Sequence, residues 1–130
     1  MKQVLIAAIS LLTLFSCQEK GGSVVGQKTT MELKNEYKVG NVAKGEKIKT
    51  EIKVKNTGNY PLIIANVTGQ CSCTVTDKPS EPIAPGETGV IKSLIDTENF
   101  VAGAISKTVS ITANTEPSVS RVTIKANIIN

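Results

Sequence analysis

The stretch Lys47–Lys55, with the sequence KIKTEIKVK, alternates at every position between two kinds of side chain. Ile48, Thr50, Ile52 and Val54 fall on one side, and four lysines and Glu51 fall on the other. A strict period of two is typical of a β-strand with one buried and one solvated face. Because the apolar face must be covered, this strand predicts a second layer packed against it.

The rest of the chain repeats this pattern in short segments separated by Gly, Pro, Asn or Asp. Further strands are expected at Met31–Lys34, Tyr37–Val42, Pro61–Val67, Thr88–Asp96, Ile105–Asn114 and Val119–Ile128. Asn56-Thr57-Gly58-Asn59 supplies turn residues, so the strands 47–55 and 61–67 are expected to form a hairpin.

This pattern predicts an all-β fold, an immunoglobulin-like antiparallel two-sheet sandwich of about seven strands. The chain has 130 residues, which suits one domain, and no helical period follows its apolar beginning. Tryptophan is absent, and so is the widely spaced cysteine pair of antibody domains, so the expected likeness is one of architecture only.

A proline-rich segment, Lys78–Glu87, lies between two of the expected strands and holds three prolines in positions 79–85. Proline lacks the N–H that a strand ladder needs, so the segment is expected to run as an extended surface loop ending in a Pro-Gly turn. Such a loop fixes the approach of the next strand. A binding loop is the alternative.

The first residues are typical of a bacterial secretion signal. Lys2 precedes an apolar run, Val4–Phe15, that is shorter than the ~20 residues a membrane-spanning helix needs. Leu14-Phe15-Ser16-Cys17 resembles a lipobox, so Cys17 is predicted to be lipidated; a plain secretory signal is the alternative. The expected organisation is a signal peptide over 1–16, lipidated Cys17 with a flexible tether over 17–29, and the sandwich over 30–130.

The predicted signal peptide also bears on the net charge of the mature protein and on its location. Removal of Lys2 with the signal leaves fourteen basic and eleven acidic side chains, a net charge of +3. The lysines alternate along strands and do not cluster with aromatic residues, so nucleic-acid binding is not expected. Gln18 after the cysteine favours the outer over the inner membrane. The membrane, reached through the lipid anchor, is therefore one predicted partner.

Several motifs occur in a fixed order: Asn56-Thr57-Gly58, Pro61-Leu62, Cys71-Ser72-Cys73-Thr74, and Pro82-Ile83-Ala84-Pro85-Gly86-Glu87. Together they resemble the family known as domain of unknown function 1573, over residues 31 to 128. The resemblance implies an immunoglobulin-like sandwich, similar to bacterial chaperone and sperm-protein domains, in secreted proteins and lipoproteins of Bacteroidetes-type bacteria. It implies no activity. Ser72 departs from the family pattern, which usually has Gly there.

Cys71 and Cys73 are the candidate chemical site. On a regular strand their Cα atoms lie about 6.6 Å apart, near the ~6.8 Å limit for a disulfide, so a bridge needs a bent backbone. Three interpretations stay open: a structural staple or packed thiols, a thiol-redox pair, and a metal pair for copper or zinc. No flanking histidine lowers a thiol pKa, although Lys78 is near in sequence, and the chain has no His to complete a zinc site.

An enzyme is not expected, because histidine is absent and no Gly-rich phosphate loop leads from a strand into a helix. The leading prediction is a lipid-anchored envelope protein that serves as a binding or structural module. Its loops or an open strand edge would meet an envelope protein or a polymer. The alternative is a thiol-redox or copper-handling envelope factor that uses Cys71 and Cys73.

Overall fold

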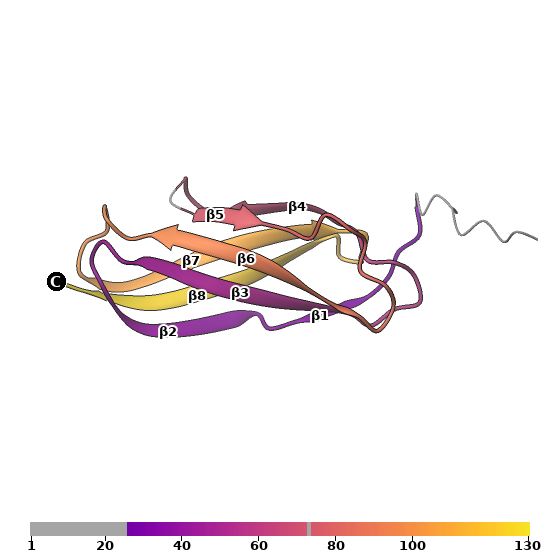
Figure 1. The fold of residues 1–130 in the computed structure, drawn as a ribbon, viewed down its shortest axis with the longest axis horizontal. Coiled ribbons are helices and arrows are strands. Elements are labelled where there is room, and N and C mark those ends of the chain that lie inside the picture. The colour runs from indigo at the N-terminus through magenta and orange to yellow at the C-terminus, as the bar shows by residue number, and fades with distance from the viewer. Residues whose placement is uncertain (1–25, 73) are drawn as a thin grey trace, which may run out of the picture.

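The computed structural model describes residues 26–72 and 74–130, and their regular secondary structure is entirely β (Figure 1). Two four-stranded sheets pack against each other, with strand orders β1-β3-β6-β5 and β2-β8-β7-β4. The strands are β1 Met31–Leu33, β2 Glu36–Ala43, β3 Lys47–Asn56, β4 Ile64–Gly69, β5 Thr74–Asp77, β6 Thr88–Asp96, β7 Gly103–Ala113 and β8 Val119–Ile129. The predicted all-β two-sheet sandwich is therefore confirmed.

The core lies between the sheets and is built from the alternating apolar positions. Along β3 every second residue is buried, and Ile52 and Val54 are 0% exposed. From the facing sheet, Val109, Val122 and Ile124 are buried to 1% exposure or less. Branched aliphatic side chains fill this space with few aromatic residues, because they pack well on pleated surfaces.

One strand pair departs from the predicted antiparallel arrangement. β2 runs parallel to β8, whereas all the other pairs among the named strands are antiparallel. The cause is a change of sheet at Lys34–Asn35. There the chain leaves its place beside β3 and continues in β2 as the neighbour of β8.

The hairpin predicted from the strands 47–55 and 61–67 was wrong. β3 and β4 belong to opposite sheets, and β4 begins only at Ile64. The Asn56 side chain donates from Nδ2 to the carbonyls of Tyr60 at 2.7 Å and Ile83 at 2.8 Å. These bonds hold the connection across the end of the sandwich, where Leu62 forms an isolated bridge with Ile83.

The prediction also missed β5 and gave only part of the proline-rich segment correctly. β5 has four residues directly after the cysteine motif, too few for a clear alternating pattern.

Within the segment 78–87, Ile83 is 6% exposed and belongs to the core, so this part is no surface loop. The Pro-Gly turn is confirmed: the Glu87 N–H donates to the Ala84 carbonyl at 3.0 Å, and Gly86 has a φ of +81°.

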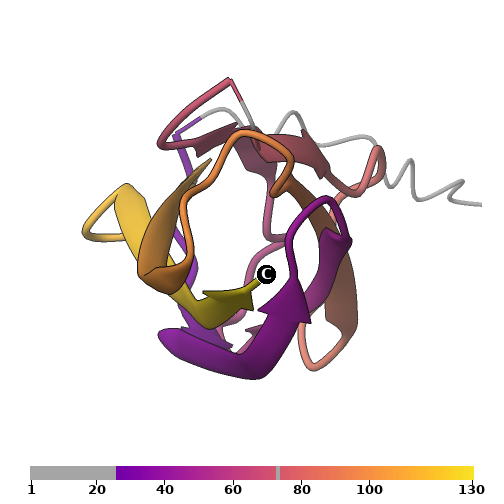
Figure 2. The ribbon, with the colours of Figure 1, turned by 90° about the vertical axis from the view of Figure 1, so that its left-hand side faces the viewer.

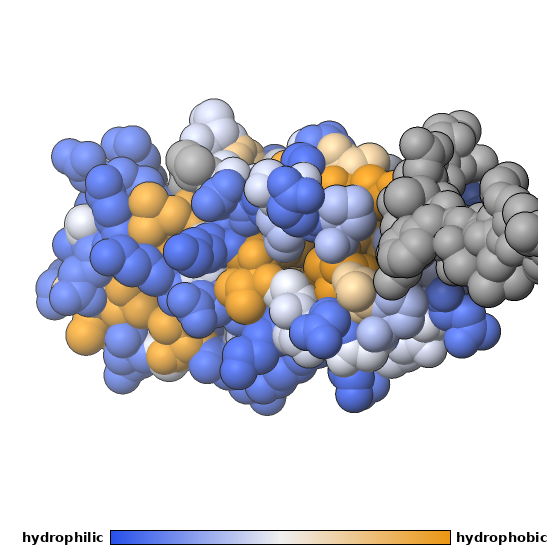
Figure 3. Space-filling model, turned by 45° about the vertical axis from the view of Figure 1, so that its right-hand side comes forward, coloured by the Kyte–Doolittle hydropathy of each residue, from blue (hydrophilic) through white to orange (hydrophobic). Residues whose placement is uncertain are grey.

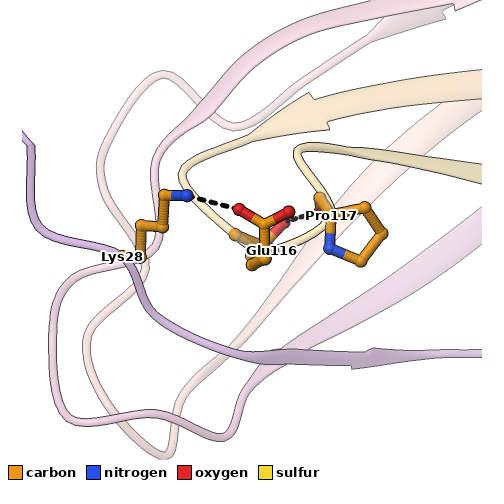
Figure 4. Close-up of polar contacts among 4 residues, drawn as sticks. Lys28, Glu116 and Pro117 are labelled. Carbon is orange, nitrogen blue, oxygen red and sulfur yellow. Dashed lines mark hydrogen bonds and ion pairs between the residues drawn. The ribbon is translucent and has the colours of Figure 1, made fainter.

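The two ends of the sandwich differ in what they carry. The chain enters at the end that holds the connections 57–63, 78–87 and 114–118, and the opposite end holds the cysteine turn and the C-terminus (Figures 1 and 2). Gln27–Thr29, assigned to the tether by sequence, already contact the domain. Thr29 is 5% exposed, and Lys28 forms an ion pair with Glu116 in the 114–118 turn (Figure 4). That ion pair lowers the pKa of the Glu116 carboxyl.

Candidate functional site

One side of the sandwich leaves a long strand edge without a partner strand. β1 pairs only with Val54–Asn56 of β3, in the register that sets Glu32 opposite Lys55. The segment Lys47–Lys53 therefore has β6 on one side and no strand of residues 26–72 or 74–130 on the other. Because β1 crosses to the other sheet after Leu33, the opening is a direct consequence of the change of sheet.

Hydrogen bonds at the end of β3 fix which backbone groups face this opening. The Asn56 N–H donates toward β6, to the Glu87 carbonyl, whereas the Thr57 N–H donates the other way, to the Thr30 carbonyl, each at 2.9 Å. Backbone groups alternate in direction along an antiparallel strand. The N–H and C=O groups of Lys49, Glu51 and Lys53 therefore point along the sheet into the opening.

The same residues present their side chains to solvent on the outer face of the sheet. Lys47, Lys49, Glu51 and Lys53 are all exposed. The register of β3 with β6 continues from Lys47 to Lys55 without a bulge, so this edge is regular. The outer edge of β2 is different. A register shift lies between Lys38 and Gly40, and the φ of Gly40 is +88°, which is a common way to prevent strand addition.

A hollow of about 640 Å³ lies beside the open edge, and the β3 residues that line it are exposed on the outer face of the sheet. It is bounded by the change of sheet and by β3, and its lining consists of Glu32, Leu33, Lys34, Tyr37, Glu51, Lys53, Lys55 and Thr88. The Lys34 ammonium lies 5.2 Å from the centre of the Tyr37 ring, a cation–π distance. Three lysines and two glutamates make the hollow basic overall.

Charged groups also line the neighbouring β2 strand. The Glu36 carboxylate accepts from Lys125 on β8 at 2.7 Å and lies 3.7 Å from Lys38. The hydrogen bond from Lys125 is the main reason that the pKa of Glu36 is lowered. Glu36 is therefore already neutralised by its own neighbours, whereas no ion pair within residues 26–72 and 74–130 engages the β3 lysines.

The opposite side of the sandwich carries the cysteine motif in the turn from β4 to β5. The Thr74 N–H donates to the Cys71 carbonyl at 3.1 Å, and the sulfur of Cys71 lies 3.7 Å from the Thr74 hydroxyl. Cys71 is half-buried and disulfide-bonded. Both other cysteines, Cys17 and Cys73, lie outside the described residues, so lipidation of Cys17 and the pairing of Cys71 with Cys73 stay predictions.

Lys78, which is near the cysteine motif in sequence, is separated from it by β5. Lys78 follows β5 and lies at the other end of that strand. The register of β4 with β7 pairs Gly69 with Val109, and the Gln70 N–H donates to the Thr108 carbonyl. Lys107, one residue before Thr108 on β7, directs its ammonium to the Phe100 ring, whose centre lies 4.7 Å away.

The turn also joins the two sheets closely. A Cβ atom at Gly69 would lie 2.4 Å from the Cβ of Thr74, so only glycine lets β5 approach β4 here. The Thr76 hydroxyl donates across the gap to the Val67 carbonyl at 3.0 Å. Within residues 26–72 and 74–130, no three His, Cys, Asp or Glu side chains gather closely enough to hold a metal ion.

The remaining motifs are structural. Asn56 is 0% exposed, and its Oδ1 accepts from the Thr29 hydroxyl and from the Gly58 N–H. Asn114 acts in the same way, since it donates to the carbonyls of Gln27 and Pro61 and accepts from the Ile63 N–H. These two asparagines supply hydrogen-bond partners to backbone N–H and C=O groups at the end of the sandwich where the chain enters. The Asn-Thr-Gly motif therefore needs no ligand to explain it.

The family model described as "Protein of unknown function (DUF1573)" matches residues 30–128, and the chain therefore belongs to that family. Among solved structures, the chain is similar to a protein of unknown function from Porphyromonas gingivalis W83. The TM-score is 0.67 at 24% identity, over 84% of this chain and 51% of that one.

Two further structures share the fold alone. The secreted serine protease VesC from Vibrio cholerae gives a TM-score of 0.62 at 9% identity, over 82% of this chain and 25% of that one. A PapD-like domain of human CEP192 gives 0.58 at 10% identity, over 79% of this chain and 87% of that one. The immunoglobulin-like sandwich is thereby confirmed, but no activity transfers at these identities. The chain spans about half or less of the Porphyromonas and Vibrio proteins.

No curated protein matches the chain. Among the described residues, no helix has the length and hydropathy needed to cross a membrane.

Proposed function

We propose that this protein is a lipid-anchored module of the bacterial cell envelope that binds an extended segment of another envelope protein along the open edge of β3. The observation that carries the proposal is the regular, unpaired edge Lys47–Lys53. The inferred free N–H and C=O groups at Lys49, Glu51 and Lys53 offer a partner strand a ready ladder of hydrogen bonds.

The tether supports this role. Cys17, proposed to carry the lipid, precedes the end of the domain where Gln27–Thr29 are bound, and β3 runs from the far end of the sandwich toward that end. An anchored domain held at one end leaves its long sides accessible. The membrane in question is proposed to be the outer membrane.

Proline at position 51 tests the proposed edge. Glu51→Pro removes an N–H that points into the opening and not toward β6, so the fold should tolerate the change whereas strand addition should fail. The matched control is Glu51→Ala, which keeps the N–H. A photo-crosslinking amino acid in place of Lys49 should give a reproducible protein adduct in intact cells with wild type and Glu51→Ala, and none with Glu51→Pro.

A second crosslinking position serves as the internal reference. Arg121 lies on β8, in the other sheet, and is exposed. The proposal predicts no adduct from position 121. An adduct from position 49 that survives Glu51→Pro, or one of equal yield from position 121, would show that the β3 edge is not the binding surface.

The anchor is tested separately by replacing Cys17. Two acyl chains or more, at ~0.8 kcal/mol per buried CH₂, hold a protein firmly on a membrane. Cys17→Ala should therefore move the protein from the membrane fraction into the soluble envelope fraction. Retention of the Cys17→Ala protein with membranes would contradict the lipid anchor and leave the edge proposal standing.

A second candidate function centres on the cysteine turn, where the half-buried position of the Cys71 disulfide leaves the bond within reach of another thiol. Mass spectrometry of protein taken from its own envelope, with and without reductant, measures whether Cys71 and Cys73 exchange. Titration with Cu(I) tests for a copper site. Slow reduction and no stoichiometric copper would leave the turn as a structural staple.

A further inference from the structure

We infer that the partner segment accepted by β3 alternates apolar and charged residues, with acidic side chains opposite Lys53 and Lys49 and a basic or neutral one opposite Glu51. This inference rests on the proposed binding at the β3 edge. It follows from which side chains a strand in that position would meet.

β1 provides the precedent within the chain itself. Its sequence, Met31-Glu32-Leu33, alternates apolar, acidic and apolar residues. Glu32 lies directly opposite Lys55, while Met31 and Leu33 are partly buried and pack against the core. A segment that continued this line along β3, in the same antiparallel sense, would next meet Lys53, Glu51 and Lys49 on its outer side.

Directly opposed residues of an antiparallel pair project from the same face. The partner's acidic side chains would thus lie over the exposed lysines on the outer face, and its intervening residues would turn toward the core side, as Met31 and Leu33 of β1 do. Because Met31 and Leu33, which hold the equivalent positions in β1, pack against the core, those intervening residues are inferred to be apolar. A hydrophobic strand without charges fits less well, because it would cover the exposed lysines without giving them partners.

A second copy of this chain is a poor partner for the same edge, because its charges do not complement those of β3. When β3 is paired antiparallel with itself, every register that aligns the outward residues sets a lysine against a lysine or Glu51 against Glu51. Like charges directly opposite each other are destabilising. The space-filling view in Figure 3 shows apolar residues only in separate patches between polar ones, so on that face no broad apolar surface favours self-association.

Three seven-residue peptides test the inferred pattern against the full-length protein in detergent, by fluorescence anisotropy at low salt. Each alternates valine with three variable residues: Glu, Lys, Glu in the first, Lys, Glu, Lys in the second, and three Thr in the third. Three favourable cross-strand charge pairs should make the first peptide bind roughly three- to 150-fold more tightly than the third. The second should bind most weakly, and added salt should shrink the differences.

Exchanging the charges on the protein provides the matched control. Lys49→Glu together with Lys53→Glu should reverse the preference, so that the Lys, Glu, Lys peptide binds better than the Glu, Lys, Glu peptide. Both positions are exposed, so the doubly substituted protein should keep its fold. Glu51→Pro should abolish binding of every peptide.

The outcomes separate the inference from the proposed function. If all three peptides bind equally and Glu51→Pro abolishes binding, the edge accepts strands without regard to charge, and the inferred pattern is wrong while the proposed function stands. If the acidic peptide binds Glu51→Pro as well as wild type, the lysines attract anions without strand pairing, and both fail. If no peptide binds, the inferred pattern is overturned, and the crosslinking test alone decides the proposed function.

Discussion

The two long sides of the sandwich are built differently. On one side the chain turns from β4 to β5 at the cysteine motif, and the sheets are joined by the contact of Gly69 with Thr74 and by a side-chain hydrogen bond from Thr76. On the other side the chain passes from β1 to β2, and among the described residues most of β3 has a partner strand, β6, on one edge only. One side is closed by a tight turn, and the other is open along seven residues.

This difference between the two sides indicates which of them is better suited to bind a partner. On the closed side the edge strands β4 and β5 are short, with six and four residues, and the Thr76 hydroxyl bridges them by its bond to the Val67 carbonyl, so this side offers a partner strand little length. An open side keeps backbone groups free, and its alternating lysines protect it against indiscriminate strand pairing without blocking a partner of the opposite charge. The open side is therefore the better candidate for binding.

The largest expected effect compares two neighbouring prolines on β3. Ile52→Pro removes an N–H that points to β6 and a side chain that is 0% exposed, so it should lower the free energy of unfolding by about 4 kcal/mol or more. Glu51→Pro should change it by only about 1 kcal/mol, because its N–H points into the opening. Urea denaturation followed by circular dichroism measures both. Equal losses would mean that the edge at Glu51 is not free.

Asn56 ends β3, in the part of the strand that β1 covers. Asn56→Ala leaves the carbonyls of Tyr60 and Ile83 without their buried donor, and should cost about 3 kcal/mol. Asn59→Ala is the control, since Asn59 is exposed and lies three residues further along the same connection. Because the Thr29 hydroxyl also loses its acceptor, amide exchange along β1 should become faster. Unchanged exchange there would mean that Asn56 does not hold β1 in place beside β3.

Much of the fold could be predicted from sequence because one physical signal dominates it. In β3 and β8 the period of two runs almost without interruption, and both were placed within about a residue of their observed bounds. The pairing of strands was harder to predict. Asn56-Thr57-Gly58 has the composition of a hairpin turn, but Asn56 uses its side chain to bind Ile83, a partner 27 positions away.

The sequence predicted the type of candidate site, an open strand edge, but not which strand provides it. An open strand edge was expected, but nothing in the order of residues says that β1 stops pairing after Leu33, because this depends on the change of sheet. The surroundings of Cys71 depend on strand positions for a related reason. Lys78 is close to the motif in sequence, but β5 lies between them, and this four-residue strand is too short to be read from the pattern of residues.

On the closed side, the contact at Gly69 gives a smaller expected effect. Gly69→Ala brings two Cβ atoms to 2.4 Å, so β5 must shift, at a cost of about 1–3 kcal/mol. Thr74→Gly removes the opposing Cβ, and combining the two changes should recover part of the loss. Thermal denaturation of both single variants and the double variant measures this coupling. Strictly additive effects would contradict a direct contact between β4 and β5.

The smallest expected effect is a pH dependence beside the open edge, at Glu36. Its pKa is lowered in the folded protein, mainly by the hydrogen bond from Lys125, so the contribution of this group to stability is present above its unfolded pKa near 4.5. That contribution is lost as the pH falls through the lower folded pKa. With Glu36→Gln, the melting temperature should therefore fall less steeply between about pH 5 and pH 3, and at pH 7 it should change by no more than about a degree.

Because the ion pair fixes β2 to β8 and not to β3, the same substitution should leave peptide binding at the β3 edge unchanged. A loss of binding in Glu36→Gln would mean that β2 and β3 act together, and the open side would then extend across both sheets.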